Sequence, residues 1–255
     1  MNPWNTYDAR IRAGGGYGRD AVLHREQAFI RSKLPKSLSY KSLEINGVQQ
    51  NAAVIDSDDF SLKTICCMPG EPLPHGGLVN WAGEHWLITR KNADTEVYSK
   101  GTMELCNHLL RWIDASGEIV ERWCIVSDGT KYLTGEWSDN DNVVTRGDMR
   151  TSLIIARDQY TVKLNRSNRF LIDDGASPNA IAYRLTKPFK LGSGCNETGV
   201  LSFVLSECNT EDSDNFELRI ANYYDYFPAE KNDDTGNVSP DDGAAGDTSG
   251  KKVWI

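Results

Sequence analysis

The sequence predicts a mainly β protein, with a small antiparallel β-barrel followed by a second β-rich barrel or sandwich module. Three observations carry this prediction. Asn46-Gly47 stands between two alternating apolar and polar runs, which is a strong short-range signal for a β-hairpin. Short strand-like runs then recur between turn residues as far as residue 228. Only residues 19–34 show a convincing helical period.

The first 37 residues are predicted to be an arm and a helix. Residues 1–17 are polar, with three consecutive glycines at 14–16, and we expect a flexible arm there. From 19 to 34 the chain is typical of an amphipathic helix that Asp20 caps and Pro35 ends. Its apolar stripe consists of Val22, Leu23, Phe29, Ile30 and Leu34.

Residues 38–98 are assigned to the small β-barrel. Besides Asn46-Gly47, a second tight turn is predicted at Ala82-Gly83, inside the run VNWAGEHWLI. The apolar side chains that would fill this barrel include Leu78, Val79, Trp81, Trp86, Leu87 and Ile88.

Residues 99–228 are assigned to the second β-rich module. The run MELCNHLLRWID and the run EIVERWCIVSDG flank Ser116-Gly117, which predicts another hairpin. The polar turn DNDN at 139–142 separates further strand-like runs. Whether the two β-rich parts form one domain or two is left open by the pattern.

Residues 229–255 form an acidic tail that we expect to be disordered. Between residue 229 and residue 252 no apolar side chain is larger than Val, so the segment cannot bury a core. The apolar tip Val253-Trp254-Ile255 either docks on a neighbour as an added strand or is an unstructured end.

Charge is distributed unevenly along the 255 residues. The net charge of −8 matches that of residues 207–255 alone, where 12 acidic residues face 4 basic ones, whereas the first 40 residues hold 7 basic and 3 acidic ones. An acidic chain is not a sequence-specific reader of nucleic acid. The basic head can meet an acidic protein surface, a phosphate backbone or only water. The candidate partner-binding residues are Arg10, Arg12, Arg19, Arg25, Arg31, Lys33 and Trp254.

The sequence lacks the patterns of a catalytic or metal site. It holds neither G-x-S-x-G nor a phosphate-binding loop with its Lys-Ser/Thr pair, and its four histidines fall in no paired ligand motif. We therefore expect no catalytic residue, no cofactor and no metal. The six cysteines are predicted to be mainly buried, reduced thiols in a protein made in the cytosol. We expect no membrane partner, because no apolar run is long enough to span a bilayer.

Several stretches resemble structural proteins of tailed bacteriophages and prophages. The run PGEPLPHGGLVNWAGEHWLITR is similar to the small β-barrel of head-closure (stopper or head-completion) proteins of the neck. The later runs LLRWIDASGEIVERWCIVSDGTKYLTGE, RFLIDDGASPNAIAYRLTKPFKL and DNFELRIANYYDYF resemble longer virion proteins of phages of Gram-positive bacteria. The resemblance covers roughly residues 30–228.

This resemblance implies a non-enzymatic structural protein of the virion, made in the cytoplasm of the bacterial host. It implies a homo-oligomeric ring at the head–tail connector that retains packaged DNA and docks the tail. The implied partners are the portal or adaptor protein and tail proteins of the same virion, with non-specific contact of the basic head with packaged double-stranded DNA.

Two alternative functions remain open. The protein could be a collar, tail or baseplate component, which differs from a neck protein by position only. It could also be a carbohydrate-binding or adhesion module, because its seven Trp and ten Tyr residues could supply stacking platforms such as Trp137. Most of the Trp residues alternate with polar residues in strands, so we predict that they belong to the core.

Overall fold

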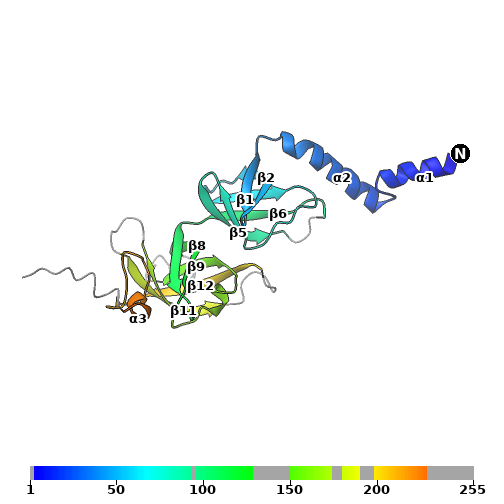
Figure 1. Ribbon diagram of the computed structural model, residues 1–255. Coiled ribbons are helices and arrows are strands. Elements are labelled where there is room, and N and C mark those ends of the chain that lie inside the picture. The colour runs from blue at the N-terminus through cyan, green and yellow to red at the C-terminus, as the bar shows by residue number, and fades with distance from the viewer. Residues whose placement is uncertain (1–2, 93–95, 129–149, 174–179, 190–197, 229–255) are drawn as a thin grey trace, which may run out of the picture.

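The computed structural model confirms the mainly β fold, and it describes residues 3–92, 96–128, 150–173, 180–189 and 198–228. A helical arm, a closed β-barrel and a second β module follow one another along the molecule (Figure 1). The predicted turn at 139–142, Trp137 and the acidic tail at 229–255 lie outside the described ranges.

The barrel contains six antiparallel strands in the order β1-β2-β3-β6-β5-β4, and β1 pairs with β4 to close it. The predicted boundary at residue 98 does not match this barrel, because its strand β6 starts at residue 100. β6 pairs with both β3 and β5. The run MELCNHLLRWID is therefore divided at Cys106-Asn107 between the barrel and the second module. The strands are β1 Tyr40–Ile45, β2 Val48–Asp56, β3 Leu62–Cys67, β4 Leu78–Trp81, β5 Glu84–Lys91 and β6 Lys100–Leu105.

Two-residue turns connect β1 to β2 and β4 to β5, as predicted. Asn46 and Gly47 both have positive φ angles, of 50° and 81°, and they join Ile45 directly to Val48. This backbone geometry matches the twist of the flanking strands. Ala82 and Gly83 repeat it with φ angles of 56° and 80°. The barrel core around Trp86 contains Leu43, Ile45, Ala52, Val54, Ile65, Cys67, Leu73, Val79, Trp86, Ile88 and Met103.

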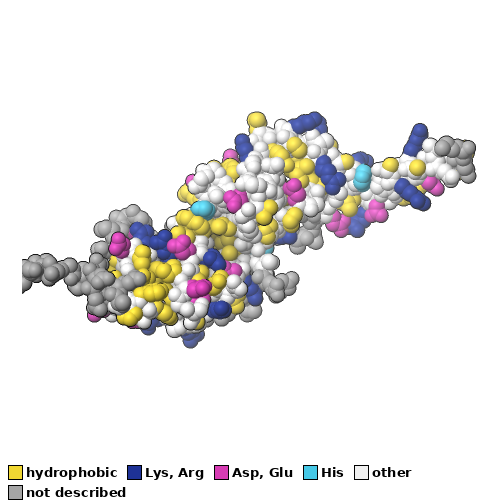
Figure 2. Space-filling view, in the orientation of Figure 1, with side chains coloured by type: hydrophobic (Ala, Val, Ile, Leu, Met, Phe, Trp, Pro, Cys, Tyr) yellow, Lys and Arg dark blue, Asp and Glu magenta, His cyan; other side chains and the backbone are white. Residues whose placement is uncertain are grey.

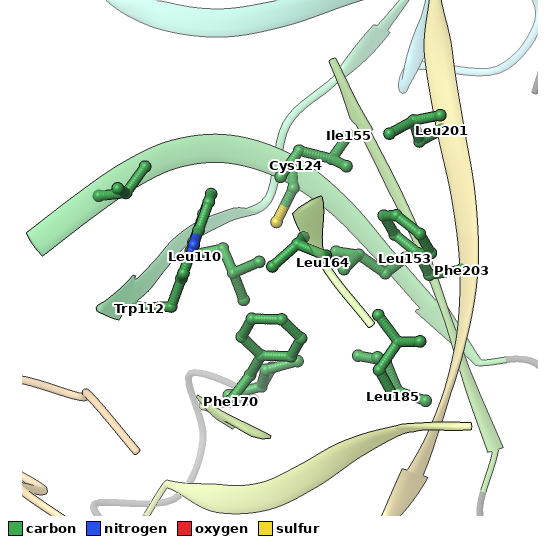
Figure 3. Packing of buried hydrophobic residues seen from close by; sticks show 13 residues of the cluster. Leu110, Trp112, Cys124, Leu153, Ile155, Leu164, Phe170, Leu185, Leu201 and Phe203 are labelled. Atoms are coloured by element: carbon green, nitrogen blue, oxygen red, sulfur yellow. The ribbon is translucent and has the colours of Figure 1, made fainter. Parts of the chain in front are cut away.

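The second module is a six-stranded antiparallel sheet, in the order β10-β11-β12-β9-β8-β7, that curves into a nearly closed barrel. Figure 3 shows the side chains of its core, in which the rings of Trp112 and Phe170 meet edge to face with centroids 6.3 Å apart. The predicted turn at Ser116-Gly117 is confirmed as the connection between β7 and β8. The strands are β7 His108–Ile113, β8 Ile119–Asp128, β9 Arg150–Ala156, β10 Arg169–Ile172, β11 Ile181–Phe189 and β12 Val200–Glu207, and a 3₁₀ turn η2 covers Thr161–Lys163.

Residues 208–227 cover the seam where the two edge strands β7 and β10 approach each other. This segment includes the short helix α3, Tyr223–Tyr226. Arg111 of β7 donates a hydrogen bond to the carbonyl of Leu218 at 3.2 Å, and Arg219 forms an ion pair with Asp173, just after β10, at 2.7 Å. Exposed edge strands favour aggregation. By covering β7 and β10, this segment protects the two edges of the sheet.

A buried ion pair fastens the same segment to the edge strand β10. The two terminal nitrogens of Arg169 reach the two carboxylate oxygens of Asp214 at 2.9 Å each, and the side chains are 3% and 0% exposed. The backbone N–H groups of Glu211 and Asn222 also donate to Asp214, at 2.8 and 2.9 Å. The Arg169 guanidinium further donates to the carbonyl of Asn209 at 2.8 Å. Both charges are therefore compensated within the protein.

The stability of this seam is expected to fall as the pH drops below the ordinary His pKa of 6.5. His108 is buried at the start of β7, and burial, together with the charges of Arg219 and Arg111, lowers its pKa against the opposing effect of Asp173. In this pH range the unfolded chain binds more protons than the folded one, so the free energy of unfolding decreases with acidification. Urea unfolding at a series of pH values measures this slope.

The variant His108→Gln should have a shallower slope between pH 7 and pH 5 than the wild type. His24→Gln, which changes an exposed histidine of the arm, is the matched control and should keep the wild-type slope. Equal slopes for His108→Gln and the wild type would show that another group is responsible.

The barrel and the second module share a buried interface. Leu87 and Cys106 on the barrel side pack with Ile125 and Val200 of the second module. The ring of His85 stacks on Trp123, across the interface, with centroids 4.2 Å apart. An apolar interface of this kind holds two modules in a fixed relation.

A close backbone approach adds to this interface. A Cβ atom placed on Gly76 would lie 1.9 Å from the carbonyl oxygen of Gly199, at the start of β12. Gly76 also has a φ of 78°, in the region that favours glycine. Both properties require glycine where the barrel meets the second module.

Candidate partner-binding surface

The helical arm of residues 3–33 is the main surface that the rest of the described chain leaves uncovered. It consists of α1, Pro3–Ala13, and α2, Arg19–Lys33, followed by the 3₁₀ turn η1, Leu34–Lys36. Neither α1 nor α2 has a buried residue, and Figure 1 shows the arm extending away from the barrel. Helices of this length are marginal in water by themselves.

The prediction of a flexible segment at 1–17 was wrong for residues 3–13, which form α1. Trp4, Tyr7 and Ile11 recur at the spacing of one helix face, which is the signal that the glycine run obscured. The glycines themselves end α1 and turn the chain. The N–H of Gly14 donates to Arg10 and that of Gly16 donates to Ile11, at 3.0 and 2.9 Å.

Gly15 fixes the corner between the two helices. Its φ is 92°, and a Cβ atom there would lie 2.4 Å from the Cβ atom of His24 on α2. The glycine run therefore permits a close approach of α1 and α2, rather than only lending flexibility.

The predicted helix at 19–34 is confirmed as α2, but its N-cap is Gly18 and not Asp20, and no side chain caps it. Its apolar stripe divides into half-buried and exposed members. Leu23, Ile30 and Leu34 are half-buried, whereas Val22 and Phe29 are exposed. The half-buried face is on the barrel side, where Gln27 donates a hydrogen bond to the carbonyl of Glu96 at 2.9 Å. Val22 and Leu23 line a pocket with Glu96 and Val97, so Phe29 is the member of the stripe that is left for another surface.

The structure separates the predicted partner-binding bases into two groups. Arg19 binds both carboxylate oxygens of Glu96 at 2.6 Å, and Arg31 reaches the carbonyl of Pro69 at 3.5 Å, so both hold α2 on the barrel. Arg10, Arg12, Arg25 and Lys33 are exposed along the arm, and Arg25 lies 3.5 Å from Glu26. Trp254 lies outside the described residues. Figure 2 shows Lys and Arg side chains spread along the arm.

An exposed aromatic cluster at the arm was missed by the sequence analysis. The rings of Trp4 and Tyr7 meet edge to face with centroids 6.1 Å apart, and Tyr17 lies near Tyr7. Trp4 is 70% exposed and Tyr17 is 66% exposed. We call these three residues, with the exposed Arg10 and Arg12, the arm tip.

A second exposed apolar surface lies on the barrel, at the end of β2 and in the loop that follows. Leu38 is 93% exposed and Phe60 is 79% exposed. Ile55 is exposed as well, and Leu38 lies at the same end of the barrel, because the N–H of Val54 donates to the carbonyl of Ser39 at 2.8 Å.

Three carboxylates lie in the same segment as Ile55 and Phe60, at the end of β2 and in the loop that follows. Asp56 pairs with Lys63 at 2.7 Å, and Asp58 is exposed. Asp59 accepts hydrogen bonds from the N–H and the hydroxyl of Ser61, and these bonds hold its pKa below the ordinary value. We call Leu38, Ile55 and Phe60, with Asp56, Asp58 and Asp59, the acidic patch.

The Trp residues of the strands that the structure describes are mainly packed inside. Trp86 and Trp112 are buried, as predicted for core residues. Trp81 and Trp123 are half-buried, and each stacks on or tilts against a neighbouring ring. The large exposed indole of the described chain is thus Trp4, on the arm.

The cysteines of the described ranges are reduced, as predicted. Cys66, Cys67, Cys106 and Cys124 are buried and Cys208 is half-buried, and all five are free thiols. Within the same ranges, His, Cys, Asp and Glu side chains form no group of three that could hold a metal ion. No helix in the described part of the chain has the length and apolar character needed to cross a membrane.

The buried thiols are expected to resist alkylation in the folded protein. Burial raises the pKa of Cys67 and Cys106 to about 12, and it raises the pKa of Cys66 and Cys124 in the same direction. The thiolate is the reactive form, so iodoacetamide near neutral pH should modify these four more slowly than in the unfolded chain, by at least about 100-fold at Cys67 and Cys106.

Peptide mapping by mass spectrometry measures the modification of each cysteine separately. Cys208 should react first among the five, because it is half-buried. Unfolded protein in urea is the control, in which the five should react at similar rates. Fast modification of Cys124 in the folded protein would contradict the core packing of the second module.

The fold and the exposed surfaces define a class of protein: two joined β modules that carry a basic, aromatic helical arm. No protein-family model, no curated protein and no solved structure matches the chain.

Proposed function

We propose that this protein is a non-enzymatic structural protein of a phage virion, placed at the head-to-tail interface as a head-closure (stopper) protein. In this proposal it forms a homo-oligomeric ring that retains packaged DNA and docks the tail. The observation that carries the proposal is the uncovered helical arm, which offers exposed aromatic and Arg side chains and buries no residue of its own. Such surfaces mark sites of protein–protein interaction.

The two β modules support the same proposal from the mechanical side. A closed barrel and a nearly closed one, joined through a buried interface, make a stiff subunit that can bear load in an assembly. The run from Val79 to Ile88, which carries the resemblance to head-closure barrels, forms the β4–β5 hairpin of the closed barrel. The balanced charge of residues 1–206 suits a conduit that must not hold the passing DNA phosphates.

Purified virions test the proposal. Mass spectrometry should detect the chain among the virion proteins, and immunogold labelling should place it between head and tail. Labelling at a collar, the tail tube or the baseplate would favour the alternative structural positions. Absence from virions would overturn the proposal as a whole.

A further inference from the structure

The arm tip and the acidic patch are two exposed surfaces of complementary composition. The arm tip is aromatic and carries Arg10 and Arg12 against one acid, Asp8, and the acidic patch combines exposed apolar side chains with Asp58 and Asp59, besides Asp56, which pairs with Lys63. We infer that the arm tip of one copy binds the acidic patch of a neighbouring copy. This inference rests on the proposed function, since it supplies the contact between subunits of the ring.

The arm tip has the composition of an interface centre. Trp, Tyr and Arg are the residue types enriched among those that dominate binding energy at protein interfaces. The edge-to-face packing of Trp4 on Tyr7 holds these two rings in place before any partner arrives. Side chains ordered in advance lose less conformational entropy on binding.

The acidic patch has the opposite charge and exposed apolar side chains of its own. Phe60 and Leu38 are among the most exposed large apolar side chains of the described chain, so burying them against aromatic rings is favourable. The lowered pKa keeps Asp59 ionised, and Asp58 adds a second exposed carboxylate. Facing charges of opposite sign steer two copies into one register.

The contact must join two copies, because α2 separates the two surfaces within one chain. α2 has 15 residues and is therefore about 22 Å long. Its far end carries the arm tip, whereas its near end leads through η1 to Leu38. The contacts of Arg19 and Gln27 with Glu96 hold α2 against the barrel, so the tip is kept away from the patch of its own chain.

A contact between two different surfaces is heterologous. Each copy then offers one arm tip and one acidic patch, so the copies follow one another head to tail. Such a chain of contacts closes into a ring when the rotation between copies permits closure, and otherwise forms a filament. A ring built in this way needs no symmetric, twofold contact between its subunits.

Sedimentation analysis of the full chain tests the inference with two variants. The arm variant carries Tyr7→Ala and Arg12→Glu, and the patch variant carries Asp58→Lys and Phe60→Ser. The wild type should associate beyond dimers, less so at high salt. Each variant alone should associate roughly thirtyfold more weakly or worse, as expected for loss of a dominant contact.

A mixture of the two variants gives the sharpest result. The patch variant keeps an intact arm tip and the arm variant keeps an intact acidic patch, so equal amounts should form one-to-one heterodimers and nothing larger. The controls are Arg166→Glu and Glu118→Lys, both at exposed residues of the second module, which change charge equally and should associate as the wild type does. Circular dichroism confirms that each variant is folded.

Three results would overturn the inference: a wild type that stays monomeric at its solubility limit in low salt, a patch variant that associates like the wild type, or a mixture without heterodimers. The second result would indicate a symmetric contact between two arms. If labelling places the protein at the neck while the mixture fails, the ring uses other contacts and only this inference is wrong. If heterodimers form but virions lack the protein, the proposed function is the part that fails.

Discussion

Replacing Arg169 by Met is expected to lower the free energy of unfolding of the second module by about 3–5 kcal/mol. The substitution leaves the fully buried carboxylate of Asp214 without its charge partner. The two backbone N–H donors of Glu211 and Asn222 remain, but they do not neutralise the charge. Urea unfolding followed by tryptophan fluorescence measures the loss, because Trp112 lies in the core of the same module.

Two further variants isolate the buried charge as the cause. Arg184→Met changes the residue paired with Arg169 on the next strand, where the side chain is half exposed and lies 3.9 Å from Glu211, so its effect should stay within about 0.5 kcal/mol. The double variant Arg169→Met with Asp214→Leu removes both charges and should regain only part of the stability, because the N–H groups of Glu211 and Asn222 lose their acceptor. If Arg169→Met were as harmless as Arg184→Met, the ion pair would not fasten the seam.

Gly76→Ala is expected to destabilise the protein by about 2–5 kcal/mol. A left-handed backbone costs an alanine about 1–2 kcal/mol, and forced displacement in a packed region adds about 1–3 kcal/mol. The displacement is required because the new methyl group would lie 1.9 Å from the carbonyl oxygen of Gly199. Since the obstacle is backbone of the other module, the two modules must move apart. Thermal unfolding and limited proteolysis measure both effects.

Gly117→Ala is the matched control for this steric argument. Gly117 has a φ of 84°, close to that of Gly76, but no atom lies within 4 Å of its virtual Cβ position. Gly117→Ala should therefore lower the free energy of unfolding only by the cost of an alanine in a left-handed backbone, about 1–2 kcal/mol. Equal losses for the two variants would mean that the modules are not held together at Gly76.

Local signals made the β-hairpins predictable, whereas pairing between distant segments was not. Asn46-Gly47 and Ser116-Gly117 are turns that neighbouring residues determine by themselves. The division of the barrel at residue 98 failed because β6 belongs to the barrel through its pairing with β3 and β5, and alternation continues on both sides of Cys106 without a turn signal. A contact between distant strands leaves no mark in a single sequence.

The sequence predicted that the candidate site is basic, but it did not predict which of its side chains contact the barrel. The surplus of bases in the first 40 residues pointed to the arm, but the pairing of Arg19 with Glu96, 77 positions away, is a tertiary contact. The acidic patch was missed for the same reason. A Phe residue within a polar loop suggests a side chain that packs on the core and fixes the loop. In the folded barrel, however, Phe60 is exposed.

The segment that covers the seam also affects how the chain folds during its synthesis on the ribosome. The barrel is formed by residues 40–105 alone, so it can fold while later residues are still being added. The second module cannot be finished in that way, because Asp214 and Ile220, which fasten and fill its seam, are translated after all six of its strands. Until they emerge, β7 and β10 are unprotected edges, and nascent chains on neighbouring ribosomes are at risk of pairing there.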